Sequence, residues 1–200
     1  MSLRDRKRAR TRQALVDAAT ELFERRGYDE TTVADIAAAA EIGTRTFFGY
    51  FASKEELLFP ESDARVQAVR DAIASRAPAE GPAEVLLRAL GAVPEAGDDL
   101  VSPLAALRLR LIRTVPAVRG RALQIQLDAQ QEIARQLADA FPDRLDPVAA
   151  GALTGAFIGA ITGALQALLD TTGHPATPAD LHTALQAATD TALAPWRAAD

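Results

Sequence analysis

The sequence has no cysteine, and its 200 residues include only one tryptophan, one methionine and two histidines. The lack of cysteine excludes disulfides, thiolate metal sites and cysteine nucleophiles, and it fits an intracellular protein. Aromatic residues make up 5% of the chain and hydrophobic residues 48%, because most apolar positions hold alanine or leucine. Such a composition favours helices over sheets.

Patterns that would indicate an enzyme are also missing. His174 and His182 stand eight residues apart near the C-terminal end, without a glycine-rich phosphate loop or a paired acidic motif elsewhere in the chain. We therefore expect no catalytic site, no metal site and no cofactor. The basic opening segment 1–13 is not followed by an apolar core with a cleavage site, so it is not a secretory signal and we expect a cytoplasmic protein.

No alternating strand pattern of useful length is present, so the sequence predicts an all-α fold. The first helix is expected from Arg6 to Arg26 and should end at Gly27. Its predicted buried face holds Leu15, Ala18, Ala19, Leu22 and Phe23. Prolines and glycines divide the body of the chain. The helices expected there are one resuming near Ser62 after Pro60, and others over about 82–93, 102–114, 116–141, 147–170 and from 178 onward.

Residues 31–57 have the pattern of two short helices joined by a tight turn, followed by a third helix. Thr32 is the expected cap of the first helix, whose apolar stripe has helical spacing. Gly43 is expected to supply the backbone freedom for the turn, and Ile42 to fill the angle between the helices. Ser53 and Glu56 predict a capping box that starts the third helix.

The second short helix, predicted from Thr44 to Phe51, is the candidate recognition element, with Phe47 and Phe51 turned inward. Arg45 suits the O6 and N7 acceptors of guanine, although a phosphate contact or a solvated charge fits the same residue type. The residues predicted to contact DNA are Thr32, Thr44, Arg45, Thr46, Phe48, Tyr50 and Lys54.

The formal net charge of −5 and the pI of about 5.1 argue against a nucleic-acid partner only until the distribution of charge is considered. The first twelve residues hold one acid, Asp5, and six basic side chains: Arg4, Arg6, Lys7, Arg8, Arg10 and Arg12. Such a segment can neutralise phosphates with a salt-dependent affinity. A flexible solubilising tail is the alternative interpretation.

These motifs together resemble the amino-terminal domain of the TetR family of transcriptional regulators. The matching residues are Phe23, Gly27, Tyr28, Thr31, Thr32, Val33, Ile36, Ala37, Tyr50, Phe51, Ser53, Lys54, Glu55, Glu56 and Leu57. The chain departs from the family at Phe48, where many relatives carry a tyrosine whose hydroxyl meets a phosphate, and at Arg45, where relatives often have glycine. The resemblance implies an all-α protein of about nine helices. It places a three-helix helix-turn-helix DNA-binding domain over 1–56 and a ligand-binding and dimerisation domain over 57–200.

The segment from Pro147 to Leu169 contains no charged residue, and glycine recurs in it every four residues. By length it could span a membrane, but its threonines, its high alanine and glycine content and its lack of flanking anchors favour a buried helix. Because the TetR family forms its dimer through the last two long helices, the resemblance implies a dimer interface there. The residues predicted for it are Gly151, Gly155, Gly159, Gly163, Leu185 and Trp196.

The resulting hypothesis is a homodimeric, ligand-responsive repressor that binds a palindromic double-stranded DNA operator and is released by a small effector. The stretch LRLRLIRTVPAVRGR is similar to the TetR subgroup with acyl-coenzyme-A-like ligands, which indicates an apolar or acyl-type effector. The predicted pocket residues are Leu104, Leu107, Arg108, Leu111, Phe157 and Ile161. The alternatives are a ligand-independent architectural DNA binder, an enzyme or a membrane-associated helical protein.

Overall fold

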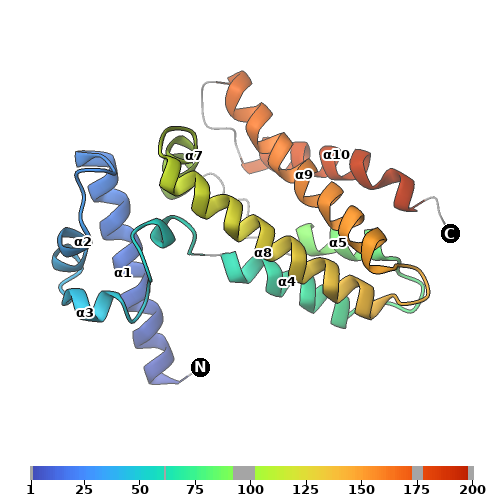
Figure 1. Cartoon of the computed structure of the whole chain (residues 1–200), viewed down its shortest axis with the longest axis horizontal. Coiled ribbons are helices and arrows are strands. Elements are labelled where there is room, and N and C mark those ends of the chain that lie inside the picture. The colour runs from blue at the N-terminus through green and yellow to red at the C-terminus, as the bar shows by residue number, and fades with distance from the viewer. Residues whose placement is uncertain (1, 61, 92–101, 173–177, 198–200) are drawn as a thin grey trace. The chain divides into compact units, whose positions relative to one another are not determined.

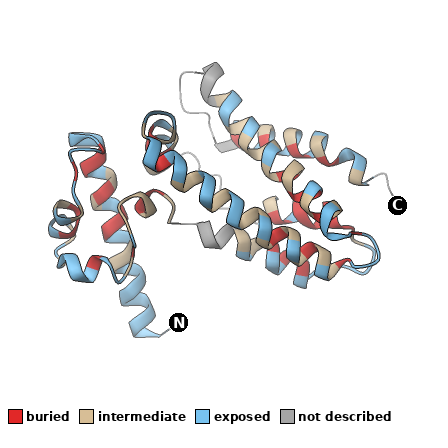
Figure 2. Cartoon of the chain, viewed as in Figure 1, coloured by how far each residue is buried: buried red, intermediate tan, exposed pale blue. Residues whose placement is uncertain are grey.

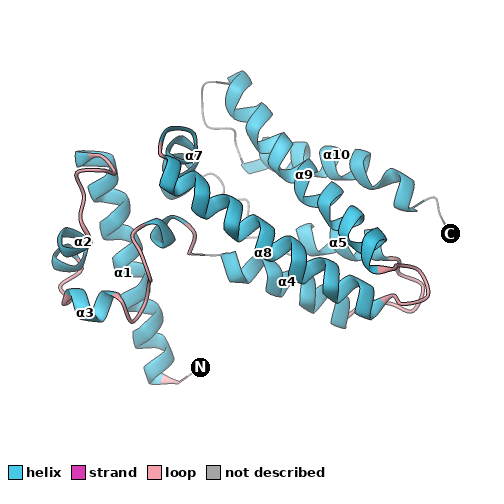
Figure 3. Ribbon diagram, viewed as in Figure 1, coloured by secondary structure: helices cyan, strands magenta, loops and turns pink. Residues whose placement is uncertain are grey.

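The computed structural model describes residues 2–60, 62–91, 102–172 and 178–197 (Figure 1). The helices are α1 (Leu3–Arg26), α2 (Val33–Ala39), α3 (Thr44–Phe47), the 3-10 helix η1 (Glu55–Leu58), α4 (Ser62–Ala74), α5 (Pro82–Gly91), α7 (Pro103–Thr114), α8 (Pro116–Ala140), α9 (Pro147–Thr172) and α10 (Pro178–Arg197). Within the described ranges every regular element is helical (Figure 3), which confirms the predicted all-α class.

The chain divides into two compact units. The first unit comprises Met1–Pro60 together with Pro103–Ala122, and the second comprises Glu61–Ser102 together with Leu123–Asp200. The unit that contains the helix-turn-helix therefore also contains α7 and the first part of α8, which lie far along the sequence from residues 1–56.

The first unit is organised around the apolar face of α1. Ser2 and Asp5 form a capping box that starts this helix at Leu3, and Gly27 ends it with a φ of 89°. The prediction that Gly27 ends α1 is thus confirmed, because glycine adopts a positive φ without steric cost. Figure 2 shows the buried residues on the faces of α1, α2 and α3 that are turned toward one another. The core residues include Leu15, Val16, Ala19, Leu22, Phe23, Ile36, Ala37, Phe47, Phe51, Leu57 and Leu58.

The turn between α2 and α3 differs from the prediction. The residue with a left-handed backbone is Glu41, with a φ of 56°, whereas Gly43 is extended with a φ of −78° and precedes α3. The amide of Ile42 donates to Ala37 O at 2.9 Å, and that of Glu41 donates to Ala38 O at 3.1 Å. These two bonds form the Schellman motif that satisfies carbonyls at a helix end. In a Schellman motif with these two donors, the residue with the left-handed backbone is the one at position 41.

The recognition helix is shorter than predicted. Its α-helical part ends at Phe47, and tight turns carry the chain on to Phe51. In these turns Gly49 N donates to Thr46 O at 3.0 Å and Tyr50 N donates to Phe47 O at 2.8 Å. Glycine has a low helix propensity, so the position of Gly49 accounts for the early end.

The second unit has its own core, formed by α4, α5, α8, α9 and α10. α9 and α10 lie side by side (Figure 1). The largest buried side chains in this core include Leu86, Leu137, Leu153, Phe157 and Leu193. Ion pairs tie its surface together, with Arg70 bonded to Glu132 at 3.2 Å and Arg88 to Glu80 at 2.7 Å.

Candidate nucleic-acid interface

The position of α2 is set by a capping box at its first turn. The Thr32 hydroxyl accepts from Asp35 N at 3.2 Å, and Thr32 N donates to the Asp35 carboxylate at 2.9 Å. The Thr32 hydroxyl and then its backbone amide hold the pKa of the Asp35 carboxyl below its usual value. The predicted cap is confirmed. The DNA contact predicted for Thr32 stays a prediction, with its hydroxyl engaged on Asp35.

Lys54 holds the segment that leads into α2, a role that the sequence analysis missed. Its Nζ donates to Tyr28 O at 2.9 Å and to Thr31 O at 3.1 Å, and it lies 4.1 Å from the centre of the Tyr28 ring. Charged donors form strong hydrogen bonds to carbonyls in partly buried positions. Lys54 is therefore a positioning residue for the helix-turn-helix, and its predicted phosphate contact remains a prediction.

The capping box predicted between Ser53 and Glu56 is not formed. The 3-10 helix η1 begins after Lys54 without a side-chain cap, and Glu56 instead accepts from Ala52 N at 2.8 Å. Glu56 also forms an ion pair with Arg121 of α8 at 2.7 Å. The Glu56 carboxylate thus binds Ala52 N with one oxygen and Arg121, which is distant in sequence, with the other.

Tyr28 and Glu55 form a partly buried pair beside Lys54. The Tyr28 hydroxyl donates to the Glu55 carboxylate. Burial, and then this hydrogen bond, raise the pKa of Tyr28 well above its usual value. For Glu55, burial works to raise the pKa, but hydrogen bonds from Ser53 and Tyr28 outweigh it and leave the pKa lowered. The pair links the end of α1 to η1 and so fixes the positions of α2 and α3.

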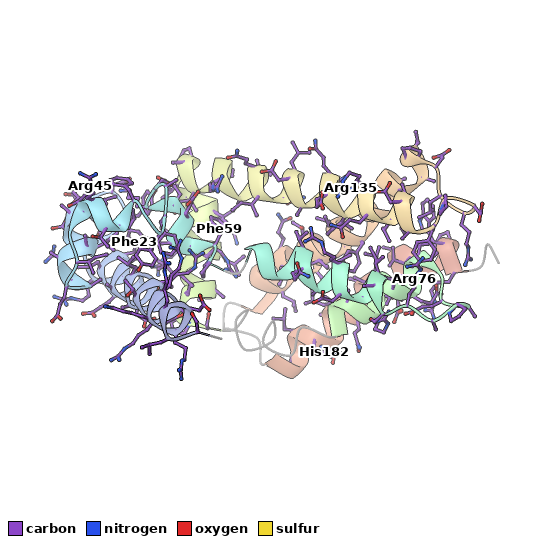
Figure 4. All side chains as sticks on the ribbon, turned by 90° about the horizontal axis from the view of Figure 1, so that it is seen from below. Phe23, Arg45, Phe59, Arg76, Arg135 and His182 are labelled. Carbon is purple, nitrogen blue, oxygen red and sulfur yellow. The ribbon has the colours of Figure 1, made fainter. Side chains whose placement is uncertain are left out.

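The outer face of α3 presents four exposed side chains: Thr44, Arg45, Thr46 and Phe48. Figure 4 shows Arg45 at the outer edge of the first unit. Within the described part of the chain the Arg45 guanidinium forms no hydrogen bond or ion pair, so its donors are available to a ligand. Phe47 and Phe51 are buried beneath this face, as predicted.

The basic N-terminal segment is helical and lies beside α3. The Arg8 guanidinium donates to Gly49 O at 3.3 Å and lies 5.1 Å from the centre of the Tyr50 ring. The Arg12 guanidinium donates to Tyr50 O and Pro60 O at 3.3 and 3.2 Å and covers the Phe51 ring. Arg12 thus stabilises the turn after α3. The exposed bases of α1 next to it, namely Arg4, Arg6, Lys7, Arg8 and Arg10, form a positive surface that suits phosphates.

Comparison with known proteins agrees with this geometry. Residues 15–59 match the family described as bacterial regulatory proteins of the tetR family. The chain is also 35% identical over 141 residues to the HTH-type transcriptional regulator TcmR of Streptomyces glaucescens, which covers 68% of this chain and 62% of TcmR. Residues 15–59 therefore belong to the tetR family of bacterial regulatory proteins. The chain spans less than two thirds of the length of TcmR.

Solved TetR-family structures share the fold along most of the chain. FadR of Thermus thermophilus, a repressor solved in complex with lauroyl-CoA, has a TM-score of 0.54 and 24% identity, and the match covers 91% of this chain and 93% of that one. The fatty acid degradation regulator FadR of Bacillus halodurans has a TM-score of 0.59 and 16% identity, with 92% and 94% covered. At these identities the similarity concerns the fold.

The predicted pocket residues of this TetR-family chain belong to two different cores. Leu107 and Leu111 lie in the core of the first unit, and Leu104 packs against it. Arg108 is 6% exposed and donates to Leu58 O at 3.2 Å, so its guanidinium supports η1. Phe157 lies in the core of the second unit, with Ile161 packed against it. The pocket itself remains a prediction.

The predicted dimer residues differ in their surroundings. A Cβ added at Gly155 would lie 3.2 Å from Gln130 Nε2 of α8, whereas a Cβ added at Gly151, Gly159 or Gly163 would have no described atom within 4 Å. Leu185 is buried within the single chain, and Trp196 packs against the core of the second unit. Gly159 and Gly163 are exposed in the single chain, which leaves them accessible to a second copy.

Proposed function

We propose that this TetR-family protein is a ligand-responsive repressor that binds an inverted-repeat operator as a homodimer in the cytoplasm. The observation that carries the proposal is the outer face of α3, where the Arg45 guanidinium is exposed and has no partner among the described residues, next to an α2 that starts with a capping box. An arginine so placed donates two hydrogen bonds to guanine, the commonest specific contact in the major groove. The exposed bases of α1 supply the phosphate contacts that orient the helix.

The apolar surface of α9 supports a homodimer. Its segment Pro147–Leu168 has a mean hydropathy of 1.7, yet only 22% of its most apolar stretch is buried inside the single chain. α9 appears mainly in the intermediate and exposed colours of Figure 2. Large uncovered apolar surfaces mark interfaces. A second copy related by a two-fold axis would cover the surface and place two heads on the two halves of a symmetric operator.

The proposed effector is an acyl thioester with a long apolar chain. Support comes from the Thermus thermophilus FadR structure, which has a similar fold and was solved in complex with lauroyl-CoA. The effector would release DNA by binding the DNA-incompetent arrangement of the dimer more tightly, with a coupling of about 1–3 kcal/mol. The first unit contains α7 and the start of α8. A displacement of these helices would therefore move part of the DNA-reading unit.

Selection of DNA fragments from a random pool with the full chain tests the proposal. We expect an enriched inverted repeat whose half-site centres are about one helical turn apart. Arg45→Ala should weaken binding to that repeat by about 1–3 kcal/mol and leave binding to random DNA nearly unchanged. Arg25→Ala is the matched control. Arg25 is an exposed arginine that pairs with Glu21 near the C-terminal end of α1, opposite to the end with the basic residues. A pool without enrichment, or one enriched in an unsymmetric site, would contradict the proposal.

The effector is tested separately on the protein–operator complex. Lauroyl-CoA should release the operator and raise the melting temperature, because a ligand of the folded state stabilises it by mass action. Coenzyme A alone and lauric acid alone are the controls that separate the two ends of the molecule. If none of the three shifts the melting temperature or releases DNA, the acyl effector is wrong while the operator result stands.

A further inference from the structure

Phe48 is a large apolar side chain that the fold leaves at the surface. It is 57% exposed, whereas its neighbour Phe47 is fully buried. Burying a phenylalanine stabilises a fold by about 1.5–3 kcal/mol, so an exposed one on the recognition helix contributes little of this. Its ring nevertheless has a defined place, since it packs edge-on against Phe47 with the centroids 5.3 Å apart and the planes at 85°.

Phe48 shares a helix face with Arg45. The two residues are three positions apart, and Thr44 is four positions before Phe48, so their side chains project from the same side of one helical turn. Arg45 and Thr44 are both exposed there. The face therefore combines a guanidinium group, a hydroxyl group and an apolar ring within one helical turn.

The chemistry of this ring limits what it can contact in DNA. Phenylalanine has neither a donor nor an acceptor, so it offers nothing to a phosphate. The apolar group that the major groove exposes at a base edge is the C5-methyl of thymine. Tyr50 does not supply this contact, because it is half-buried with Arg8 over its ring.

We propose that Phe48 is a specificity-determining residue that packs against a thymine methyl group, next to the guanine contacted by Arg45. This inference rests on the proposed operator-binding function and adds the chemistry of one position in each half-site. The operator should then contain a thymine within one or two base pairs of the guanine read by Arg45, because the two side chains arise from one helical turn. The exposed ring is the element that distinguishes thymine from cytosine there.

Replacing single thymines of the selected operator by deoxyuridine tests the proposal, since this removes only the methyl group. At one thymine per half-site the wild-type affinity should fall about fourfold, and about sixteenfold with both half-sites replaced. A fourfold change corresponds to about 0.8 kcal/mol, the value of one buried methyl-sized group. Phe48→Ala should abolish this discrimination, so that thymine and uracil operators bind equally.

Two further variants complete the cycle. Phe48→Tyr keeps the ring and should keep the discrimination, and Arg45→Ala should bind both operators more weakly while preserving the ratio between them. Circular dichroism shows whether each variant is folded, and the uracil effect on the wild type needs no variant at all. Uracil substitutions without effect at every position, or an effect that survives Phe48→Ala, would overturn the role of Phe48. Absence of any selected operator would instead overturn the proposed function.

Discussion

At the scale of single residues, several side chains of the DNA-reading unit are engaged in holding the backbone. Lys54 binds the carbonyls of Tyr28 and Thr31, Arg12 those of Tyr50 and Pro60, and Arg108 that of Leu58. Each is a cation that bonds chain segments more than twenty residues away. Arg45 on the exposed face of α3 differs from these cations, because it has no internal partner in the described part of the chain.

Glu41 gives a prediction at this scale. A non-glycine residue with a φ of 56° is strained by contact between its Cβ and the following carbonyl. Glu41→Gly should therefore raise the free energy of unfolding by about 1 kcal/mol in urea titrations followed by circular dichroism. Gly43→Ala is the matched control: the position is extended and open, so the Schellman motif should survive, and any gain of stability there should come only from the restricted unfolded chain. A destabilised Glu41→Gly variant would mean that the turn is not left-handed at residue 41.

At the scale of elements, α9 has one side packed in its own unit and one side that is exposed. Leu153 and Phe157 enter the core of its own unit, and Gly155 allows close approach to Gln130 of α8. The exposed side carries Gly159 and Gly163, among alanines and isoleucines with intermediate burial. A long apolar helix of this kind passes a length-and-composition test for a membrane span, but its contacts with α10 are those of a packed globular unit.

This division predicts how substitutions in α9 will behave. Gly159→Leu combined with Gly163→Leu should leave the helical content unchanged and convert the proposed dimer into a monomer, because both positions are exposed and a Cβ at either has no described atom within 4 Å. Operator affinity should then fall steeply, since one head alone binds only one half-site. Light scattering and operator titration measure the two effects. Gly120→Leu, at an open and exposed position of α8, is the matched control and should stay dimeric.

A Gly159 and Gly163 double variant that remains dimeric would place the interface elsewhere. Recovery of the parent protein in the membrane fraction would instead favour a membrane-associated α9.

At the scale of the whole molecule, each of the two units combines segments that are separated in the sequence. α7 and the start of α8 belong with the helix-turn-helix, where Arg110 pairs with Glu24 at 3.0 Å and Arg121 pairs with Glu56 at 2.7 Å. The rest of α8 belongs to the other unit. One continuous helix, α8, therefore takes part in both the DNA-reading core and the body core.

The division into units predicts two separable unfolding transitions. Trp196 is the chain's only tryptophan and lies in the second unit, so its fluorescence reports on that unit alone. Arg121→Met should destabilise the first unit by about 1 kcal/mol, because it leaves the half-buried Glu56 carboxylate without its cation. The circular dichroism transition should shift while the Trp196 transition stays in place. Arg135→Met removes exposed ion pairs in the second unit. If it shifts either transition, it should shift the one that Trp196 reports. Coincident shifts of both probes in Arg121→Met would show one cooperative unit instead.

The local features of this protein could be predicted from sequence because their causes are local. Helical periodicity located the buried Phe47 and Phe51, Thr32 signalled the start of α2, and Gly27 signalled the end of α1. Each depends on residues within one or two turns of the same helix. Motif order along the chain likewise sufficed to indicate the TetR family, which the comparisons then showed.

Tertiary structure decided what depends on contacts between distant segments. It placed the left-handed residue at Glu41 and not at Gly43, paired Glu56 with Arg121, and gave Lys54 two carbonyl partners in the α1–α2 connection. It also put Leu107 and Phe157 in separate cores. Charged and apolar residue types are compatible with many partners, so only the folded chain selects among them. That selection left the Arg45 guanidinium without a partner among the described residues and the Phe48 ring exposed, and these are the groups that we propose for DNA recognition.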